Sequence, residues 1–188
     1  MTLIDHERLR GNYEGLIQQL GNDPEPGFRR VGVDARIIHD VTVESTFEQY
    51  GRQWSLIGDE AVSRGGHEEG PSPLRYFMSG IAICQEGWWA KGSAVVGCDI
   101  EALEVGVRTF MDMRGEHGFG DHPTHPQWLA FHVRASSPSP SDAILKMIDW
   151  GDARCPLGVL IRLAIPIYER VIHNGSTIRD TIPAGLEQ

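Results

Sequence analysis

The chain has 188 residues, of which 40% are hydrophobic and 23% are charged, and its formal net charge is −9. These values are typical of one globular domain with a sizeable core. The 17 basic residues are scattered, which argues against a nucleic-acid backbone as the main partner, because that role needs clustered Lys and Arg. No apolar stretch reaches the roughly 18 to 20 residues that span a bilayer, and the N-terminus does not resemble a secretory signal. We therefore expect a cytoplasmic protein without membrane or nucleic-acid partners.

The first segment is expected to be a helix followed by a linker. Apolar residues recur at spacings of three and four, and Gly21 supplies an end to the helix: they are Leu9, Tyr13, Leu16, Ile17 and Leu20. Residues 22–27 include two prolines and are typical of a linker. We therefore divide the chain into an N-terminal helix and linker, residues 1–27, and a main domain, residues 28–188.

From residue 31 onward the apolar period changes from the helical one to two, which predicts strands over 31–37 and 41–47. Residues 50–53 are expected to form a turn, followed by a short strand over 54–57. A polar, glycine-rich loop then leads to Ser72 and Pro73, which suit the N-cap and the first position of a helix.

The helix beginning at Pro73 should run to about residue 96, and apolar residues occupy all of its sides. Such a helix is expected to be buried, and Gly80 and Gly87 would let another backbone approach it. Further strands are predicted around 103–107 and 131–135, on either side of a connection over 114–127 that is rich in Gly, His and Pro.

A second helix should begin with Ser139 as its cap and Pro140 in its first turn, and it leads toward Cys155. Pro166 should end any helical continuation, and a last strand is expected around Ile165, Ile167 and Val171. The predicted fold class is α+β, with antiparallel strands at both chain ends around a central buried helix.

Two of the three cysteines are candidates for thiol chemistry: Cys84, in an apolar run within the central helix, and Cys155, in Arg154-Cys155-Pro156. In a reducing compartment such a pair indicates redox chemistry rather than a structural disulfide. A thiolate that attacks a peroxide becomes a sulfenic acid, which then condenses with a second thiol. The alternative is that both are small hydrophobic residues of the core, since free cysteine is among the most buried residue types.

The order of these motifs resembles the OsmC/Ohr family over residues 31–172. Four segments carry the resemblance: the loop Gly65-Gly66-His67-Glu68-Glu69-Gly70-Pro71-Ser72-Pro73, the helix with Cys84, the start of a strand at 99–105, and Arg154-Cys155-Pro156-Leu157. The resemblance implies an OsmC-like fold, an intertwined homodimer with its cysteines near the subunit contact, and reduction of organic hydroperoxides. By the same resemblance Cys84 is the peroxidatic cysteine, Cys155 is the resolving one, and a dithiol reductant recycles the pair.

Two positions depart from the family pattern. The organic-hydroperoxide members have a Glu directly after the helix-starting proline, where this chain has Leu74, followed by Arg75. The family arginine that stabilises the thiolate has Arg52 as its nearest counterpart, and Arg36 is a second candidate. The alternative function is therefore a non-enzymatic binding protein that keeps the fold and an apolar pocket, with weak or no peroxide turnover.

The remaining candidates have simpler interpretations. Cys98 lies 14 residues beyond Cys84, about 21 Å along one helix, which is too far for contact. The loop histidines match no zinc-site spacing, so we expect them to be solvated: they are His117, His122, His125 and His132. Trp88 and Trp89 could line a pocket or pack in the core. We predict no cofactor and no metal.

Overall fold

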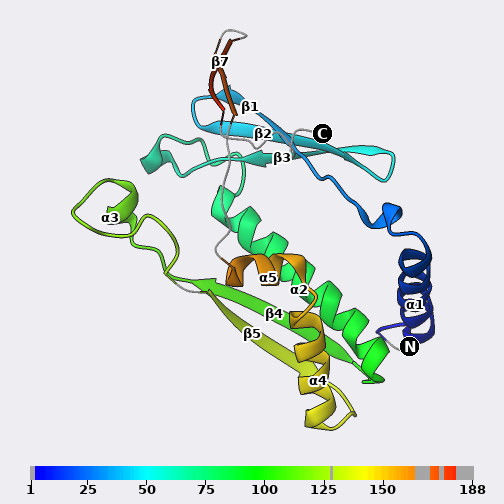
Figure 1. Ribbon diagram of the computed structural model, residues 1–188. Coiled ribbons are helices and arrows are strands. Elements are labelled where there is room, and N and C mark those ends of the chain that lie inside the picture. Colours follow the sequence, from blue (N-terminus) through cyan, green and yellow to red (C-terminus); the bar gives the residue numbers. More distant parts are fainter. Residues whose placement is uncertain (1–2, 128, 164–169, 174–175, 181–188) are drawn as a thin grey trace.

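The computed structural model describes residues 3–127, 129–163, 170–173 and 176–180. Figure 1 shows a long central helix, α2 (Pro73–Val96), between a three-stranded sheet at its start and a layer of strands and helices along its length. The helices, including two short 3-10 segments, are α1 (His6–Asn22), η1 (Glu25–Gly27), η2 (Val62–Arg64), α2, α3 (Met113–Glu116), α4 (Ser141–Asp152) and α5 (Pro156–Arg162). The strands are β1 (Asp34–His39), β2 (Thr42–Gln49), β3 (Arg52–Gly58), β4 (Ala102–Thr109), β5 (Leu129–Ser136), β6 (Arg170–His173) and β7 (Ser176–Asp180). The α+β prediction is confirmed.

The first sheet is an antiparallel meander in the order β1-β2-β3. Tyr50 and Gly51 adopt positive φ angles of 56° and 67° and make the β2–β3 turn. The turn is thus shorter than predicted, and Arg52 is the first residue of β3 rather than a turn residue.

The register gives this sheet an apolar face and a polar face. Because Ile37 pairs with Val43 and Ser45 pairs with Leu56, Ile37, Val43 and Leu56 lie on one face. The opposite face carries Arg36 and Glu44, which form an ion pair of 2.6 Å. The two faces matter below because only one end of the apolar face is covered.

Helix α2 buries one face and leaves the other open. Residues spaced three or four apart on it are buried: Ile81, Gln85, Trp89, Gly92 and Ser93. This face contacts α1, α4, α5 and β4. On the other side, Ile83 is 72% exposed, and nearer the start of the helix Phe77 is 50% exposed. The prediction that α2 is buried all round is therefore wrong for the single chain, because no described element covers that side.

The main core lies where α2, α4 and the β4–β5 pair meet, around Trp89, Cys98, Ile100 and Met147. Strands β4 and β5 match the predicted strands, and they pair antiparallel from Ala102 opposite Ser136 to Thr109 opposite Leu129. Trp89 belongs to this core, whereas Trp88 stacks at an angle on Trp150 with Lys91 over its ring.

The close approach of helix backbones occurs between α2 and α4, at glycines other than those predicted. A Cβ at Gly151 would lie 2.6 Å from Cδ1 of Trp89 and 3.1 Å from the backbone of Trp88, so only glycine fits there. Gly87 has no described atom within 4 Å of the same position, and Gly80 has only a side-chain carbon at 3.9 Å.

The remaining elements follow the prediction in part. Helix α1 extends over the predicted N-terminal segment and ends one residue after Gly21, and the proposed division at residue 27 stays a prediction. Pro140 occupies the N-cap position of α4 without a side-chain hydrogen bond, so the prediction of Ser139 as the cap is wrong; the Ser139 hydroxyl accepts a hydrogen bond from the Asp99 amide. The predicted break at Pro166 and its flanking isoleucines lie outside the described residues, whereas Val171 lies on β6. Among described residues, no helix is long and apolar enough to cross a membrane.

Candidate active site

The fold brings the thiols of Cys84 and Cys155 together although 71 positions separate them in the chain. Their sulfur atoms are 3.2 Å apart, and both cysteines are free. The Cys155 S–H donates toward the Cys84 sulfur. This arrangement makes Cys84 the hydrogen-bond acceptor of the pair.

Cys155 occupies the corner between α4 and α5. Its backbone amide donates to the Gly151 carbonyl at 2.8 Å, which closes the end of α4. Pro156 then takes the first position of α5, where its missing amide costs nothing. Cys155 is the N-cap of that helix, and its sulfur accepts a hydrogen bond from the Gly158 amide at 3.3 Å. The motif Arg154-Cys155-Pro156 is thus a helix start, which fixes the direction of the thiol.

The two thiols differ in how deeply they are buried. Cys155 is fully buried, and this burial raises the pKa of its thiol, assisted by the Cys84 sulfur and opposed by the Gly158 amide. Cys84 is only partly buried, which corrects the expectation that it is buried. A reagent can therefore reach Cys84 more easily than Cys155.

A partly buried polar network holds the corner between α4 and α5 against α2. Asp152 accepts hydrogen bonds from Gln85 Nε2 at 2.7 Å and from Trp89 Nε1 at 3.0 Å. Its second oxygen accepts from Arg162 at 3.3 Å. These contacts join α2, α4 and α5, so the segment with Cys155 cannot move away from Cys84 without breaking them.

Sequence reasoning missed this network. The available signals were Gln85, directly after Cys84 in an apolar helix, and Asp152, three residues before Cys155. Gln85 is fully buried, and its Oε1 has no hydrogen-bond partner among the described residues. That oxygen would lie 2.6 Å from a Cβ at Gly158, which explains why glycine occupies this position.

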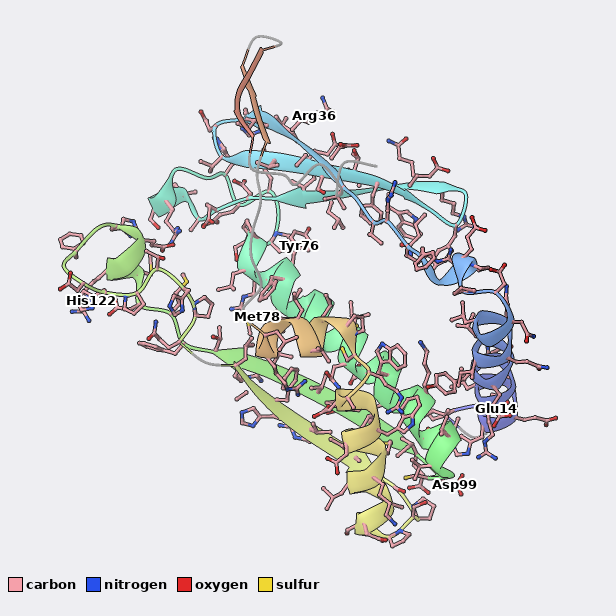
Figure 2. The ribbon with its side chains drawn as sticks, viewed as in Figure 1. Glu14, Arg36, Tyr76, Met78, Asp99 and His122 are labelled. Carbon is pink, nitrogen blue, oxygen red and sulfur yellow. The ribbon has the colours of Figure 1, made fainter. Side chains whose placement is uncertain are left out.

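The predicted arginine lies apart from the thiols within one chain. Arg52 is exposed at the start of β3, and its side chain makes no hydrogen bond or ion pair with any described residue. It lines a hollow of about 420 Å³ with Asp34, Glu48 and Gln53. Arg36, the second candidate, is held by Glu44 on the polar face of the sheet (Figure 2). The structure therefore joins the two cysteines and leaves both arginines separate.

Two hollows lie beside the start of α2. Leu74, at the position of the family Glu, lines one of about 570 Å³ together with Arg75 and Arg108. The other, of about 500 Å³, is mostly apolar and lies against the apolar face of the first sheet. Tyr76 forms part of its wall, and its hydroxyl donates to the Ile57 carbonyl at 2.8 Å (Figure 2). Its other lining residues are Val41, Val43, Ser45, Leu56, Gly58, Asp59, Glu60 and Pro73.

The loop histidines make local contacts. His117 Nδ1 lies 2.8 Å from the Met113 carbonyl, and His122 Nδ1 lies 3.4 Å from Asp112. In the described part of the chain, neither belongs to a group of three metal-ligating atoms within 4.8 Å of one another.

Comparison with solved structures identifies the architecture. An OsmC-like protein from Mycoplasma pneumoniae matches with a TM-score of 0.59 and 18% identity, over 71% of this chain and 88% of that one. The chain has the OsmC-like fold. An organic hydroperoxide resistance protein OsmC from Legionella pneumophila also matches this OsmC-like chain, with a TM-score of 0.51 and 17% identity, over 72% and 92% of the two chains. No protein-family model matches the sequence, and no curated protein does.

Proposed function

We propose that this protein is a thiol peroxidase that reduces organic hydroperoxides through Cys84 and Cys155. The observation that carries the proposal is the 3.2 Å separation of two free thiols from different helices. Proteins named for organic hydroperoxide resistance share the fold, which supports the same class of substrate. The apolar hollow beside Tyr76 suits a substrate with a hydrocarbon body.

The reaction consists of two steps at sulfur. The Cys84 thiolate attacks the terminal oxygen of the hydroperoxide, the O–O bond breaks, and the alkoxide takes a proton to leave as an alcohol. Cys84 is then a sulfenic acid. The Cys155 sulfur attacks the Cys84 sulfur, a disulfide forms, and the hydroxyl leaves as water. An external dithiol returns two electrons and two protons to restore both thiols.

The environments of the two sulfurs support this division of roles. Cys84 is partly exposed, so a hydroperoxide can reach it, whereas Cys155 is fully buried beside it. Since burial raises the pKa of the Cys155 thiol, that residue stays protonated until a sulfenic acid forms next to it. Cys155 is therefore the resolving residue.

A second candidate is a binding protein with the same fold, and Leu74 favours it. This position carries a Glu in the organic-hydroperoxide members of the family that the sequence resembles, and a leucine cannot orient an arginine by a charge-assisted hydrogen bond. In this candidate the apolar hollow holds a ligand and the thiols turn over slowly or not at all.

We also propose a homodimer, because the single chain leaves much apolar surface uncovered. Ile83 on α2 and Leu56 on the apolar sheet face are both exposed. A second copy that covers these faces would also bring the Arg52 of one chain toward the other chain, which would reconcile its proposed role with its distance from the thiols here.

The test is to mix fully reduced protein with cumene hydroperoxide in stopped flow and to count free thiols before and after. We expect the loss of two thiols per chain and the release of one alcohol per disulfide. Cys84→Ser should abolish the reaction, and Cys155→Ser should allow one oxidation and then over-oxidation. Cys98→Ser is the matched control and should behave like the parent. Turnover that persists in Cys84→Ser contradicts the thiol mechanism, and an inert parent leaves the binding protein.

The arginine and the missing carboxylate are tested by rate. Arg52→Ala should slow oxidation of Cys84 by tenfold or more if it stabilises the thiolate, while Arg36→Ala should leave the rate unchanged. Leu74→Glu should raise the rate if the carboxylate limits turnover. Equal rates in Arg52→Ala and the parent would remove Arg52 from the site.

A further inference from the structure

We propose that His39, Asp40 and His67 bind one divalent transition-metal ion of the zinc type, and that Glu69, which contacts His39, moves in as the fourth ligand. Ligating atoms of the first three residues all lie within 4.8 Å of one another. His67 Nε2 lies 2.9 Å from Asp40 Oδ2, and His39 Nε2 lies 3.3 Å from Glu69 Oε2. The two imidazole rings meet edge to face, with centroids 4.6 Å apart. Within the described ranges, this is the one group of three such residues that is so closely placed.

The ligand set and its spacing suit a borderline divalent ion. Zinc binds His nitrogen and carboxylate oxygen at about 2.0 to 2.2 Å, so neighbouring ligands of a tetrahedral site are about 3.4 Å apart. The separations of 2.9 Å between His67 Nε2 and Asp40 Oδ2 and of 3.3 Å between His39 Nε2 and Glu69 Oε2 are already near that value. Calcium and magnesium prefer sites made only of oxygen, so two imidazoles select against them.

Buried groups position the ligands of the second loop. Asp59 is 1% exposed and accepts hydrogen bonds from the backbone amides of His67 and Glu69, at 3.1 and 3.0 Å. Glu68 lies between His67 and Glu69 and has a positive φ of 59°, so His67 and Glu69 belong to the same tight turn. The backbone that carries two of the four ligands, His67 and Glu69, is therefore held in place by the Asp59 carboxylate.

The first loop is fixed by the same carboxylate. Thr42 is fully buried, its hydroxyl donates to Asp59, and its oxygen lies 3.4 Å from Nδ1 of His39. Because the single hydroxyl hydrogen goes to Asp59, the oxygen can only accept from His39, which places the imidazole proton on Nδ1. His39 Nε2 then faces the carboxylate of Glu69 at 3.3 Å, which is the side on which a metal would bind. Metal-binding histidines are commonly oriented by an outer hydrogen bond of this kind.

The ion would join two segments that are distant in sequence. Asp40 lies in the β1–β2 turn with a positive φ of 46°, and His67 lies in the loop that leads to α2. Without a metal the same four side chains can form only His–carboxylate ion pairs, which exposed side chains hold weakly. The two interpretations differ in what zinc does to the protein, and this difference can be measured.

The test is calorimetric titration of the full chain with zinc chloride, in the Cys84→Ser/Cys155→Ser background so that the thiols cannot bind the ion. We expect one zinc per chain, a higher melting temperature with zinc, and no binding of magnesium or calcium. His39→Ala and His67→Ala should each weaken binding at least tenfold. The matched control is His122→Ala, which removes a histidine that also faces a carboxylate, Asp112, and it should bind as the parent does.

Several results would overturn the proposal: no zinc binding by the parent, unchanged affinity in His39→Ala, or loss of binding in His122→Ala. Circular dichroism checks that each variant is folded. If an alanine variant is unfolded, His39→Gln replaces it, and the cobalt spectrum of the cysteine-containing parent gives a separate readout. Visible bands without thiolate charge transfer support the proposed nitrogen and oxygen ligands, whereas a thiolate band places the metal at the cysteines and contradicts them.

Discussion

At the scale of single residues, the two thiols should differ in reactivity. In a Cys84→Ser/Cys98→Ser variant, Cys155 alone remains, and its raised pKa should keep it protonated through neutral pH. We expect its alkylation by iodoacetamide at pH 7.5 to be at least tenfold slower than that of a model thiol, with the rate still rising above pH 9. The Cys98→Ser/Cys155→Ser variant, which retains the partly exposed Cys84, should react faster. The reverse order would contradict the assigned roles.

Asp59 should make the fold sensitive to acid. Burial alone would raise its pKa, but hydrogen bonds from the amides of Glu69, Glu60 and His67 and from Thr42 outweigh burial and lower the pKa to about 2. An unfolded Asp has a pKa of about 3.9. The carboxylate therefore stabilises the fold above that value, and this contribution is lost as the pH falls toward 2.

Asp59→Asn should consequently lower the urea midpoint of unfolding at pH 7, and the difference from the parent should shrink at pH 3. Asp121→Asn is the control, because Asp121 is exposed and makes no hydrogen bond with any described residue. A difference between Asp59→Asn and the parent that does not change with pH would mean that the charge of Asp59 is not what stabilises the loop.

Local patterns predicted which residues carry chemistry but could not predict their distances. Cys84 and Cys155 were identified as a pair through order and resemblance, while their contact depends on the corner between α4 and α5. The group of His39 and His67 was not predicted, because 28 positions separate the two residues and a buried carboxylate brings their loops together. The Gln85–Asp152 hydrogen bond was missed for the same reason, since periodicity carries no information about polar partners in a core.

At the scale of elements, the sequence predicted α2 well because its apolar segment is long and Pro73 and Gly97 mark its two ends. It predicted β4 and β5 well because their apolar residues alternate. It predicted the packing of α2 less well. Glycine spacing along one helix suggested a close approach at Gly80 and Gly87, but the partner α4 approaches at Gly92 and Gly151. The position of the partner helix α4 decides which glycines of α2 are closely approached, and the sequence of α2 alone does not give that position.

This packing leads to a matched pair of substitutions. Gly151→Ala should destabilise the fold by about 1 to 3 kcal/mol, because the new methyl group would lie 2.6 Å from Trp89 and force α4 away from α2. Gly15→Ala, in exposed α1 with no described atom within 4 Å of its Cβ position, should stabilise the fold by roughly 0.5 to 1 kcal/mol. Urea unfolding measures both. A neutral Gly151→Ala would mean that α4 can shift freely, and the thiol contact would then not be rigid.

At the scale of the whole molecule, the exposed apolar surface of one chain lies on two elements, helix α2 and the first sheet. The apolar face of the first sheet lines the hollow that Pro73 and Tyr76, at the start of α2, also line, and Ile83 is exposed further along the same helix. The sheet is attached to the rest through few contacts, among them the hydrogen bond of Tyr76 and that of the Asp59 amide with the Pro71 carbonyl. An exposed apolar face of this kind marks a contact surface, so a partner surface is expected to cover it.

The last prediction follows from that surface. The parent should sediment at about twice 20.9 kDa at micromolar concentration, with a buried interface above about 1,600 Å². Ile83 is 72% exposed in one chain and Leu56 is 40% exposed, so Ile83→Asp and Leu56→Asp should both weaken the dimer, and Ile83→Asp should do so with the smaller effect on the chain's own contacts. Leu145→Asp, 63% exposed on α4 at the far end from the sheet, is the control and should remain dimeric. A parent that is monomeric throughout would contradict the dimer, and it would leave Arg52 with no thiol within its reach.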